Sequence, residues 1–209
     1  MPSGRSPNRL ENKAHKSPAL AFYFALRGYV LAALLVLLIF ARIHGNAPLQ
    51  SVFLLLVAAG MVLRLWAGAC LGIHGNAART EAPQLTRNGP YRFSRNPLYL
   101  SNLLVAAGLL LFANCLQIWL VLLTLILLFA HHALLVKWEE QNLRAQWGET
   151  YASYLRTTSR WLGWPHSSGP KTETGKSQVH WNKVGAWQGR NLIYAMLSVL
   201  LIWGATRWK

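Results

Sequence analysis

Two groups of polar and aromatic residues, each beside an apolar segment, have the residue types most able to do chemistry. The first runs from Gly89 to Tyr99 and combines two arginines with three aromatic rings. Forty residues later follow two adjacent carboxylates, Glu139 and Glu140, and then Leu143, Gly148, Tyr151, Tyr154 and Arg160. Guanidinium groups, carboxylates and aromatic faces can all bind charged ligands. Their position beside apolar segments predicts a site for a small charged molecule at a membrane surface.

The two glutamates are expected to lie in different surroundings. Glu139 begins a series with spacings of four, four, four and three that shares one face of a helix: Glu139, Leu143, Trp147, Tyr151 and Tyr154. A carboxylate on such an apolar face needs a partner, either a loop arginine or a cationic ligand. Glu140 instead precedes Arg144 by four residues, the order that favours a surface ion pair.

The loop also has a simpler interpretation. Asn96 can cap a helix and Pro97 suits the first helical position, so these two residues could merely begin a helix. Arginines and tyrosines near an apolar segment are also common lipid anchors. The residue types alone leave anchoring and ligand binding equally open for this loop.

The apolar segments determine the fold class. Hydrophobic residues make up 53% of the 209-residue chain and charged residues 13%, which is typical of membrane proteins. A membrane span needs about 20 apolar residues. The segments that satisfy or approach this length are Ala19–Ala41, Leu49–Ile73, Tyr99–Val136 (two spans around a polar turn at 114–117) and Asn191–Thr206. We therefore expect an all-α, multi-pass membrane protein with about five transmembrane helices.

These segments also define the expected organisation of the chain. Residues 1–18 are polar and proline-containing, which predicts a disordered cytoplasmic tail. The core is expected at 19–164, with four spans and an amphipathic helix around 137–158. A polar linker at 165–190 and an accessory span at 191–209 are expected to follow.

The distribution of positive charge predicts the orientation. The net charge is +15, and 17 of the 21 lysines and arginines fall on one side of the expected spans. Three fall on the other side, and Arg64 lies within a span. The positive-inside rule then places the N-terminus in the cytoplasm, and we expect the inner (cell) membrane of a bacterium. Basic residues also attract anionic membrane lipids. They are spread over three segments without a nucleic-acid-binding motif, which argues against nucleic acid as a partner.

Arg64 is the charged residue within an expected span. A charge at such a depth costs about 2.5–3.5 kcal/mol on insertion scales and usually faces a polar interior. We expect Arg64 to be buried among polar groups, with partial snorkelling to the surface as the alternative. The two cysteines, Cys70 and Cys115, supply no metal-ligand set.

Taken together, these residues resemble the signature of the isoprenylcysteine carboxyl methyltransferase and phospholipid methyltransferase superfamily. The resemblance covers about Val62 to Pro165 and rests on Arg64-x-Trp66-Ala67, Leu85–Arg92, Arg95–Tyr99 and the segment from Glu139 to Arg160. It implies a multi-pass enzyme that binds S-adenosylmethionine in a pocket facing the cytoplasm. The cofactor-binding residues implied by position, or added for their charge, are Gln84, Leu85, Thr86, Tyr91, Arg92, Arg95, Asn96, Pro97, Tyr99, Glu139 and Glu140.

Two departures from the family pattern bear on the substrate. The eukaryotic prenylcysteine enzymes have His where this chain has Asn96, so a protonatable group is missing. Those enzymes also have an Arg, associated with the substrate carboxylate, at the position of Leu135. This argues against a prenylcysteine substrate. The basic residues nearby, His131, His132 and Lys137, together with Arg64, are the predicted substrate-binding residues.

The residues suit methyl transfer. An in-line displacement needs positioning more than a strong base, so no catalytic acid or base is assigned and Arg95, Asn96 and Tyr99 are expected to position the reactants. The rings of Tyr91, Tyr99 and Trp147 can stabilise a sulfonium. Glu139 suits an ammonium or ribose hydroxyls, and Arg92 or Arg95 suits a carboxylate. No Rossmann glycine motif is present.

The predicted function is that of an integral membrane methyltransferase that uses S-adenosylmethionine. Its acceptor is expected to be lipidic or small and apolar, such as a prenylcysteine-like carboxylate or a phospholipid amine. A small thiol is the alternative acceptor. A non-enzymatic membrane scaffold or transport component, in which the basic loops only set topology, is the alternative of another class. The sequence leaves open whether nitrogen, oxygen or sulfur is methylated.

Overall fold

The computed structural model describes residues 51–71, 85–113, 118–164 and 181–207. All the regular elements in these ranges are helical, as expected. They are two short 3-10 helices, η3 (Ser51–Phe53) and η6 (Gly89–Arg92), and four α-helices, α3 (Leu54–Leu71), α4 (Pro97–Phe112), α5 (Ile118–Thr157) and α6 (Trp181–Arg207). The predicted tail at 1–18 and the predicted span Ala19–Ala41 lie outside these residues.

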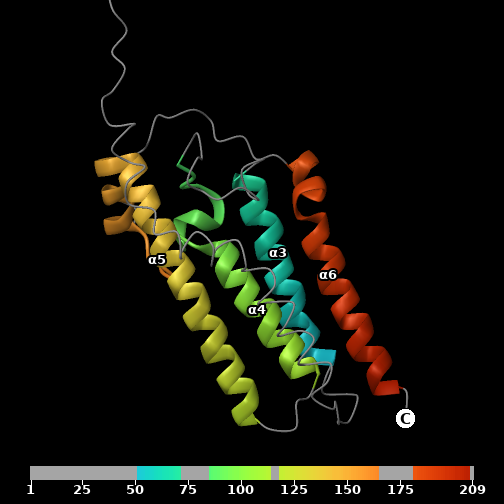
Figure 1. The fold of residues 1–209 in the computed structure, drawn as a ribbon. Helices are drawn as coiled ribbons and strands as arrows, with labels where there is room; N and C mark the ends of the chain where they lie inside the picture. Colours follow the sequence, from blue (N-terminus) through green and yellow to red (C-terminus); the bar gives the residue numbers. More distant parts are fainter. Residues whose placement is uncertain (1–50, 72–84, 114–117, 165–180, 208–209) are drawn as a thin grey trace, which may run out of the picture.

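The four α-helices run alternately up and down (Figure 1). Helix α3 contacts α4 and α6, and α4 also contacts α5. The end of α3, the short helix η6, the end of α5 and the start of α6 all lie toward one end of the bundle (Figure 1). This arrangement brings the two groups of functional residues in the sequence to the same end.

Small residues allow α3 and α4 to approach closely. A Cβ at Gly60 would lie 3.0 Å from the Ser101 carbonyl oxygen, and one at Gly108 would lie 2.8 Å from the Val57 backbone nitrogen. Small residues at helix contacts are typical of packing in membranes. Beside these contacts lies a core from α3, the α4 end and α6, made of Val57, Leu109, Phe112, Ala113 and Ile202.

Large apolar side chains remain exposed along the helices. On α5 they include Leu122, Ile126 and Leu127, and on α6 they include Met196 and Leu200. Extended exposed apolar surface on a helix is expected where lipid covers it. The bundle therefore has the surface of a membrane protein.

The number of predicted spans is not confirmed. Among the described residues, two segments are long and apolar enough to cross a membrane, Ser51–Leu71 and Val121–Thr157. Pro97–Phe112 and Asn191–Gly204 are apolar but shorter. The predicted pair of spans around residues 114–117 corresponds to α4 and the first half of α5.

Helix boundaries differ from the sequence prediction in two places. The segment around 137–158 is continuous with the preceding span in α5, and the helical backbone breaks at Gly148, where φ is 49° and ψ is −125°. Helix α6 begins at Trp181, within the predicted linker. Apolarity was the criterion that set the predicted start at Asn191. A helix continues into polar sequence when no proline interrupts it, and 181–190 contains none.

Candidate functional site

The loop before α4 is held against α3 by close packing at its glycine. Gly89 has φ of 56°, and a Cβ there would lie 2.5 Å from the Cys70 Sγ. Glycine is therefore required both by the backbone conformation and by the space available. Two residues on, the Tyr91 ring is 1% exposed and packs against Ala67 and Cys70 of α3. Tyr91 thus anchors the loop in the protein interior.

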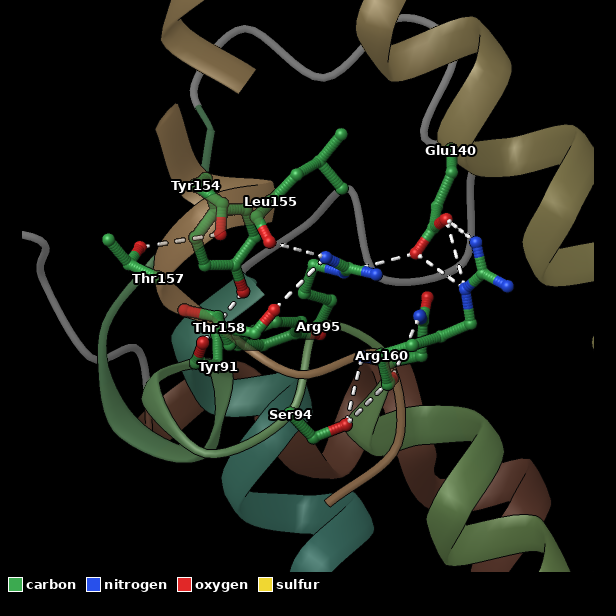
Figure 2. A network of polar contacts seen from close by, with 10 residues as sticks. Tyr91, Ser94, Arg95, Glu140, Tyr154, Leu155, Thr157, Thr158 and Arg160 are labelled. Carbon is green, nitrogen blue, oxygen red and sulfur yellow. Dashed lines mark hydrogen bonds and ion pairs between the residues drawn. The ribbon is translucent and has the colours of Figure 1, made fainter. Parts of the chain in front are cut away.

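A buried ion-pair network joins this loop to α5 and to the segment after it (Figure 2). Arg95 donates from Nε to Glu140 Oε1 at 3.1 Å and from Nη1 to the carbonyl oxygens of Leu155 and Thr158, each at 3.0 Å. Arg160 donates to Glu140 Oε2 from Nε at 3.1 Å and from Nη2 at 2.7 Å. The Arg95 and Glu140 side chains are only 10% and 9% exposed.

Glu140 also affects the acid–base behaviour of its outer partner. Arg160 is half-exposed, and its hydrogen bond to Glu140 raises the pKa of the guanidinium, an effect that burial opposes only in part. Arg160 therefore stays protonated at every pH that proteins tolerate. The positive charge that Arg160 brings to the network is therefore constant.

Backbone contacts reinforce this junction. The Arg95 N–H donates to the Ser159 carbonyl at 2.9 Å, and the Gly163 N–H donates to the Phe93 carbonyl at 3.0 Å. The Asn96 amide and the Ser94 hydroxyl both donate to the Arg160 carbonyl (Figure 2). Ser94 and Asn96 are buried. The loop is thus closed by the segment that follows α5.

The first part of the loop lies on the aromatic face of α5. Leu85 packs against the cluster of Leu143, Tyr151 and Tyr154, which Trp147 also joins. Arg87 donates to the Thr150 carbonyl and lies 5.5 Å from the Tyr154 ring centre, and burial lowers the pKa of this guanidinium, with Tyr154 opposing the effect. The Tyr154 hydroxyl donates to the Tyr91 carbonyl at 2.6 Å.

Three buried polar atoms around this junction have no hydrogen-bond partner among the described residues. They are Asn88 Oδ1 in the loop and, on α5, Asn142 Nδ2 and Trp147 Nε1. Unsatisfied buried groups are costly and call for an explanation. Two donors and one acceptor would suit a polar ligand that has a carboxylate, ring nitrogens and hydroxyl or amino groups.

A second polar cluster lies between the helices and includes a residue from each of the four. His132 of α5 lies 3.3 Å from Asn102 of α4. Asn102 accepts from Arg64 of α3, and Arg64 Nε donates to Gln188 Oε1 of α6 at 3.1 Å. Since Asn102 Oδ1 accepts from Arg64, its amide donates to His132, whose Nε2 is then the acceptor. The His132 ring also meets Tyr99 edge-on at a centroid distance of 5.3 Å.

The structure brings many of the predicted cofactor-binding residues together. Those in the loop junction are Leu85, Tyr91, Arg95, Asn96 and Glu140. Pro97 and Glu139 are buried, and Tyr99 and Thr86 are partly buried. Arg92 is exposed. Gln84 lies outside the described residues.

The predicted substrate-binding residues divide into two groups. Arg64 and His132 belong to the interhelical cluster, and His131 is buried beside His132, with ring centroids 5.3 Å apart. Lys137 lies on the exposed surface of α5.

One expectation is wrong: Glu140 does not form a surface pair with Arg144. Glu140 is 7% exposed and its carboxylate is bound by Arg95 and Arg160, whereas Arg144 is exposed. The prediction rested on the four-residue spacing of Glu140 and Arg144, which relates only neighbours on one helix. It did not consider arginines from the loop and from the segment after α5.

Sequence reasoning did not single out Asn102 and Gln188, and it named Arg160 and the segment around Ser94 as part of the motifs without giving either residue a role, although the structure places all four residues in these clusters. Asn102 could have been found, because it is a lone amide three residues after Tyr99 in an apolar run. Gln188 could not, since the segment around it was interpreted as a linker.

Comparison with known proteins agrees with this geometry. Residues 50–150 match the family model of phospholipid methyltransferase. No curated protein and no solved structure matches the chain. The matched range contains α3, the loop before α4, α4 and the part of α5 that carries Glu139 and Glu140, whereas Tyr151, Tyr154 and the segment after α5, which also build the loop junction, lie beyond it. This match identifies a phospholipid methyltransferase domain at residues 50–150, and that domain belongs to the superfamily of isoprenylcysteine carboxyl methyltransferases and phospholipid methyltransferases.

Proposed function

We propose that this protein is an integral membrane methyltransferase that transfers the methyl group of S-adenosylmethionine to a lipidic or small apolar acceptor. The observation that carries the proposal is the docking of the loop 85–96 onto α5, which brings together buried carboxylates, aromatic rings and polar atoms without a partner among the described residues. Membership in a methyltransferase family supports it.

The residues at the junction fit the chemical groups of this cofactor. Glu139 is 4% exposed and immediately precedes the ion-paired Glu140, so its carboxylate is suited to an ammonium or to ribose hydroxyls. The side-chain N–H donors of Asn142 and Trp147 suit the cofactor's carboxylate or ring nitrogens. The side-chain amide oxygen of Asn88, Oδ1, suits an amino group. Tyr99 offers an aromatic face for a sulfonium.

The proposed division of labour leaves Arg95 and Glu140 as positioning residues. Their side chains bind each other and the segment after α5, which holds the loop against the helix. The cofactor supplies an electrophilic methyl group. The protein orients this group toward the acceptor and excludes water, and these two contributions dominate in an in-line displacement.

The acceptor is proposed to reach the site from the membrane. Exposed apolar side chains continue along α5 up to Leu134, close to the carboxylate pair at Glu139 and Glu140. A lipidic acceptor can therefore approach along the helix surface without leaving an apolar environment.

Binding of S-adenosylhomocysteine to the purified full-length chain in detergent tests the cofactor assignment. Titration calorimetry is expected to give a micromolar or tighter Kd. The matched control is Glu149→Gln, which removes a carboxylate exposed on the same helix and should leave the Kd unchanged. Absence of both heat and thermal stabilisation at millimolar ligand would favour a non-enzymatic scaffold.

The acceptor class can be tested separately with methyl-labelled cofactor. Membranes containing the protein are incubated with labelled S-adenosylmethionine and then extracted with organic solvent. Label in the organic phase, above that from membranes without the protein, is expected for a lipidic acceptor. Label confined to water-soluble products would contradict the lipidic acceptor and leave a small thiol.

A further inference from the structure

The interhelical cluster contains a guanidinium whose described partners are all neutral. Arg64 donates to the amide oxygens of Asn102 and Gln188. No ion pair between Arg64 and a carboxylate occurs within 51–71, 85–113, 118–164 and 181–207. Two N–H bonds use less than half of the five donors of a guanidinium.

The cluster is also short of acceptors. The Oε1 atom of Gln188 already accepts from both Arg64 and Asn191, the latter at 2.9 Å. These two bonds fix the orientation of the Gln188 amide, and its Nε2 is then a donor. Gln188 is 1% exposed, and its Nε2 has no hydrogen-bond partner in the part of the chain that the structure describes. The cluster therefore has unused donors from two side chains.

The packing of α6 on α3 holds Gln188 in this position. A Cβ at Gly68 would lie 2.9 Å from Gln188 Cγ and 3.0 Å from Nε2. Glycine at position 68 leaves the space into which the glutamine side chain fits. Gly68 follows Arg64 by one helical turn, so both residues lie on the same face of α3.

The depth of the cluster suits an amphiphile. Arg64 lies seven residues before the end of α3, or about 10 Å along the helix at the standard rise. His132 and its contact with Tyr99 connect the cluster to α4, one turn after Asn96. A ligand bound there would have its polar group beside the loop junction and its apolar part along the exposed helix faces.

We propose that Arg64 and Gln188 form an oxyanion subsite that holds the acid group, a phosphate or a carboxylate, of the methyl acceptor. The guanidinium supplies the charge and its remaining donors, and Gln188 Nε2 supplies a further donor. This deepens the proposed function and rests on it for the identity of the ligand as acceptor. Because Gln188 lies outside residues 50–150, helix α6 is assigned a part in substrate recognition.

Binding of matched amphiphiles to the purified full-length chain in neutral detergent tests the subsite. The probes are dodecyl phosphate and laurate as oxyanions, and dodecanol as the neutral control, with intrinsic tryptophan fluorescence as the readout. Wild type is expected to bind at least one oxyanion about tenfold or more tightly than dodecanol. A preference for the phosphate assigns a phosphate-bearing acceptor, and a preference for laurate assigns a carboxylate.

Variants then localise the effect. Arg64→Gln should weaken binding of the preferred oxyanion about 10- to 100-fold, the loss expected for a charge-assisted contact, without changing dodecanol binding. Gln188→Met, which keeps the side-chain volume, should weaken oxyanion binding by a smaller factor. Ser198→Ala, at another buried polar position on α6, should leave it unchanged.

These experiments distinguish failure of the oxyanion subsite from failure of the proposed cofactor binding. Equal binding of dodecanol and both oxyanions by wild type would overturn the subsite without needing any variant to fold. Unchanged oxyanion binding in Arg64→Gln would do the same. Selective oxyanion binding without S-adenosylhomocysteine binding would preserve the subsite and reject the methyltransferase.

Discussion

Glu139 and Glu140 are adjacent and both buried, yet the structure gives them different neighbours. Glu140 is held by Arg95 and Arg160, which come from the loop and from the segment after α5. Glu139 lies one residue earlier on α5, on the series that leads to Leu143 and Tyr151. Glu140 therefore closes the junction, while Glu139 is the carboxylate proposed to contact the cofactor.

We expect Glu139→Gln to weaken S-adenosylhomocysteine binding about 10- to 150-fold, since it removes a charge-assisted hydrogen bond worth about 1.5–3 kcal/mol. Calorimetric titration of the variant against wild type measures the change. A Kd that does not move would exclude Glu139 from the cofactor contacts.

Glu140→Gln is expected to act on stability, because it leaves two arginines without their carboxylate. The loss should be about 2–3 kcal/mol, and the Tm in detergent should fall. Arg144→Gln is the matched control and should leave the Tm unchanged, since Arg144 is exposed. If Glu140→Gln and Arg144→Gln lowered the Tm equally, the result would support the surface ion pair between Glu140 and Arg144 that the four-residue spacing suggested.

The raised pKa of Arg160 leads to a pH test. A cation whose pKa is raised on folding stabilises the fold at all pH values below its unfolded pKa and loses the effect only above its folded pKa. For arginine both values lie beyond ordinary alkaline pH. Arg160→Lys introduces a group with a pKa of about 10.4 in water. The Tm difference between wild type and this variant should therefore stay constant up to about pH 10 and widen only above the lysine's unfolded pKa of about 10.4, and a difference that stays constant there would contradict the ion pair.

At the scale of single elements, Gly148 determines the shape of α5. Its backbone angles, φ 49° and ψ −125°, lie in a region that side chains with a Cβ avoid, although a Cβ there would meet no atom within 4 Å. The break redirects the chain, so that Tyr151 and Tyr154 face the loop. The conformation, and not the available space, requires glycine at this position.

Gly148→Ala is therefore expected to destabilise the protein by about 1–3 kcal/mol. Gly204→Ala is the matched control: it also has open space around its Cβ but lies within helix α6, where alanine is favoured by about 0.5–1 kcal/mol. Thermal unfolding in detergent measures both. Two variants of equal Tm would show that the break at Gly148 carries no strain.

The sequence predicted contacts between residues close together in the chain better than contacts between residues far apart in it. Leu143, Trp147, Tyr151 and Tyr154 pack together as predicted, but the break at Gly148 separates the first two from the last two, so an uninterrupted helical face is not what brings them together. The ion pairs of Glu140 join residues 20 and 45 positions apart, which no helical spacing encodes. The start of α6 was missed because apolarity predicts where lipid begins and not where a helix begins.

At the scale of the whole molecule, the alternating helices place the end of α3, the short helix η6, the start of α4 and the end of α5 toward one end of the bundle (Figure 1). The sequence predicted this common side from the distribution of lysine and arginine. Which side of the membrane it faces follows from charge alone and remains a prediction. The exposed apolar faces of α5 and α6 support insertion in a lipid bilayer.

Cysteine labelling tests the orientation. In a background with Cys70→Ala and Cys115→Ala, Glu149→Cys provides a thiol at an exposed position of α5, just after the break at Gly148. We expect a membrane-impermeant maleimide to reach it only after the cells are permeabilised, whereas Lys209→Cys should react in intact cells. Labelling of Glu149→Cys from outside would reverse the topology.

The ion pairs that close the loop also impose an order of assembly during synthesis. Phe93, Ser94 and Arg95 leave the ribosome before the residues that bind them, since their partners lie 45 to 70 positions later and the N–H of Gly163 is the last to arrive. During synthesis the loop therefore lacks these partners until α5 and the segment after it have been made. Chains stalled before residue 163 should remain sensitive to protease in this loop, and complete chains should be protected.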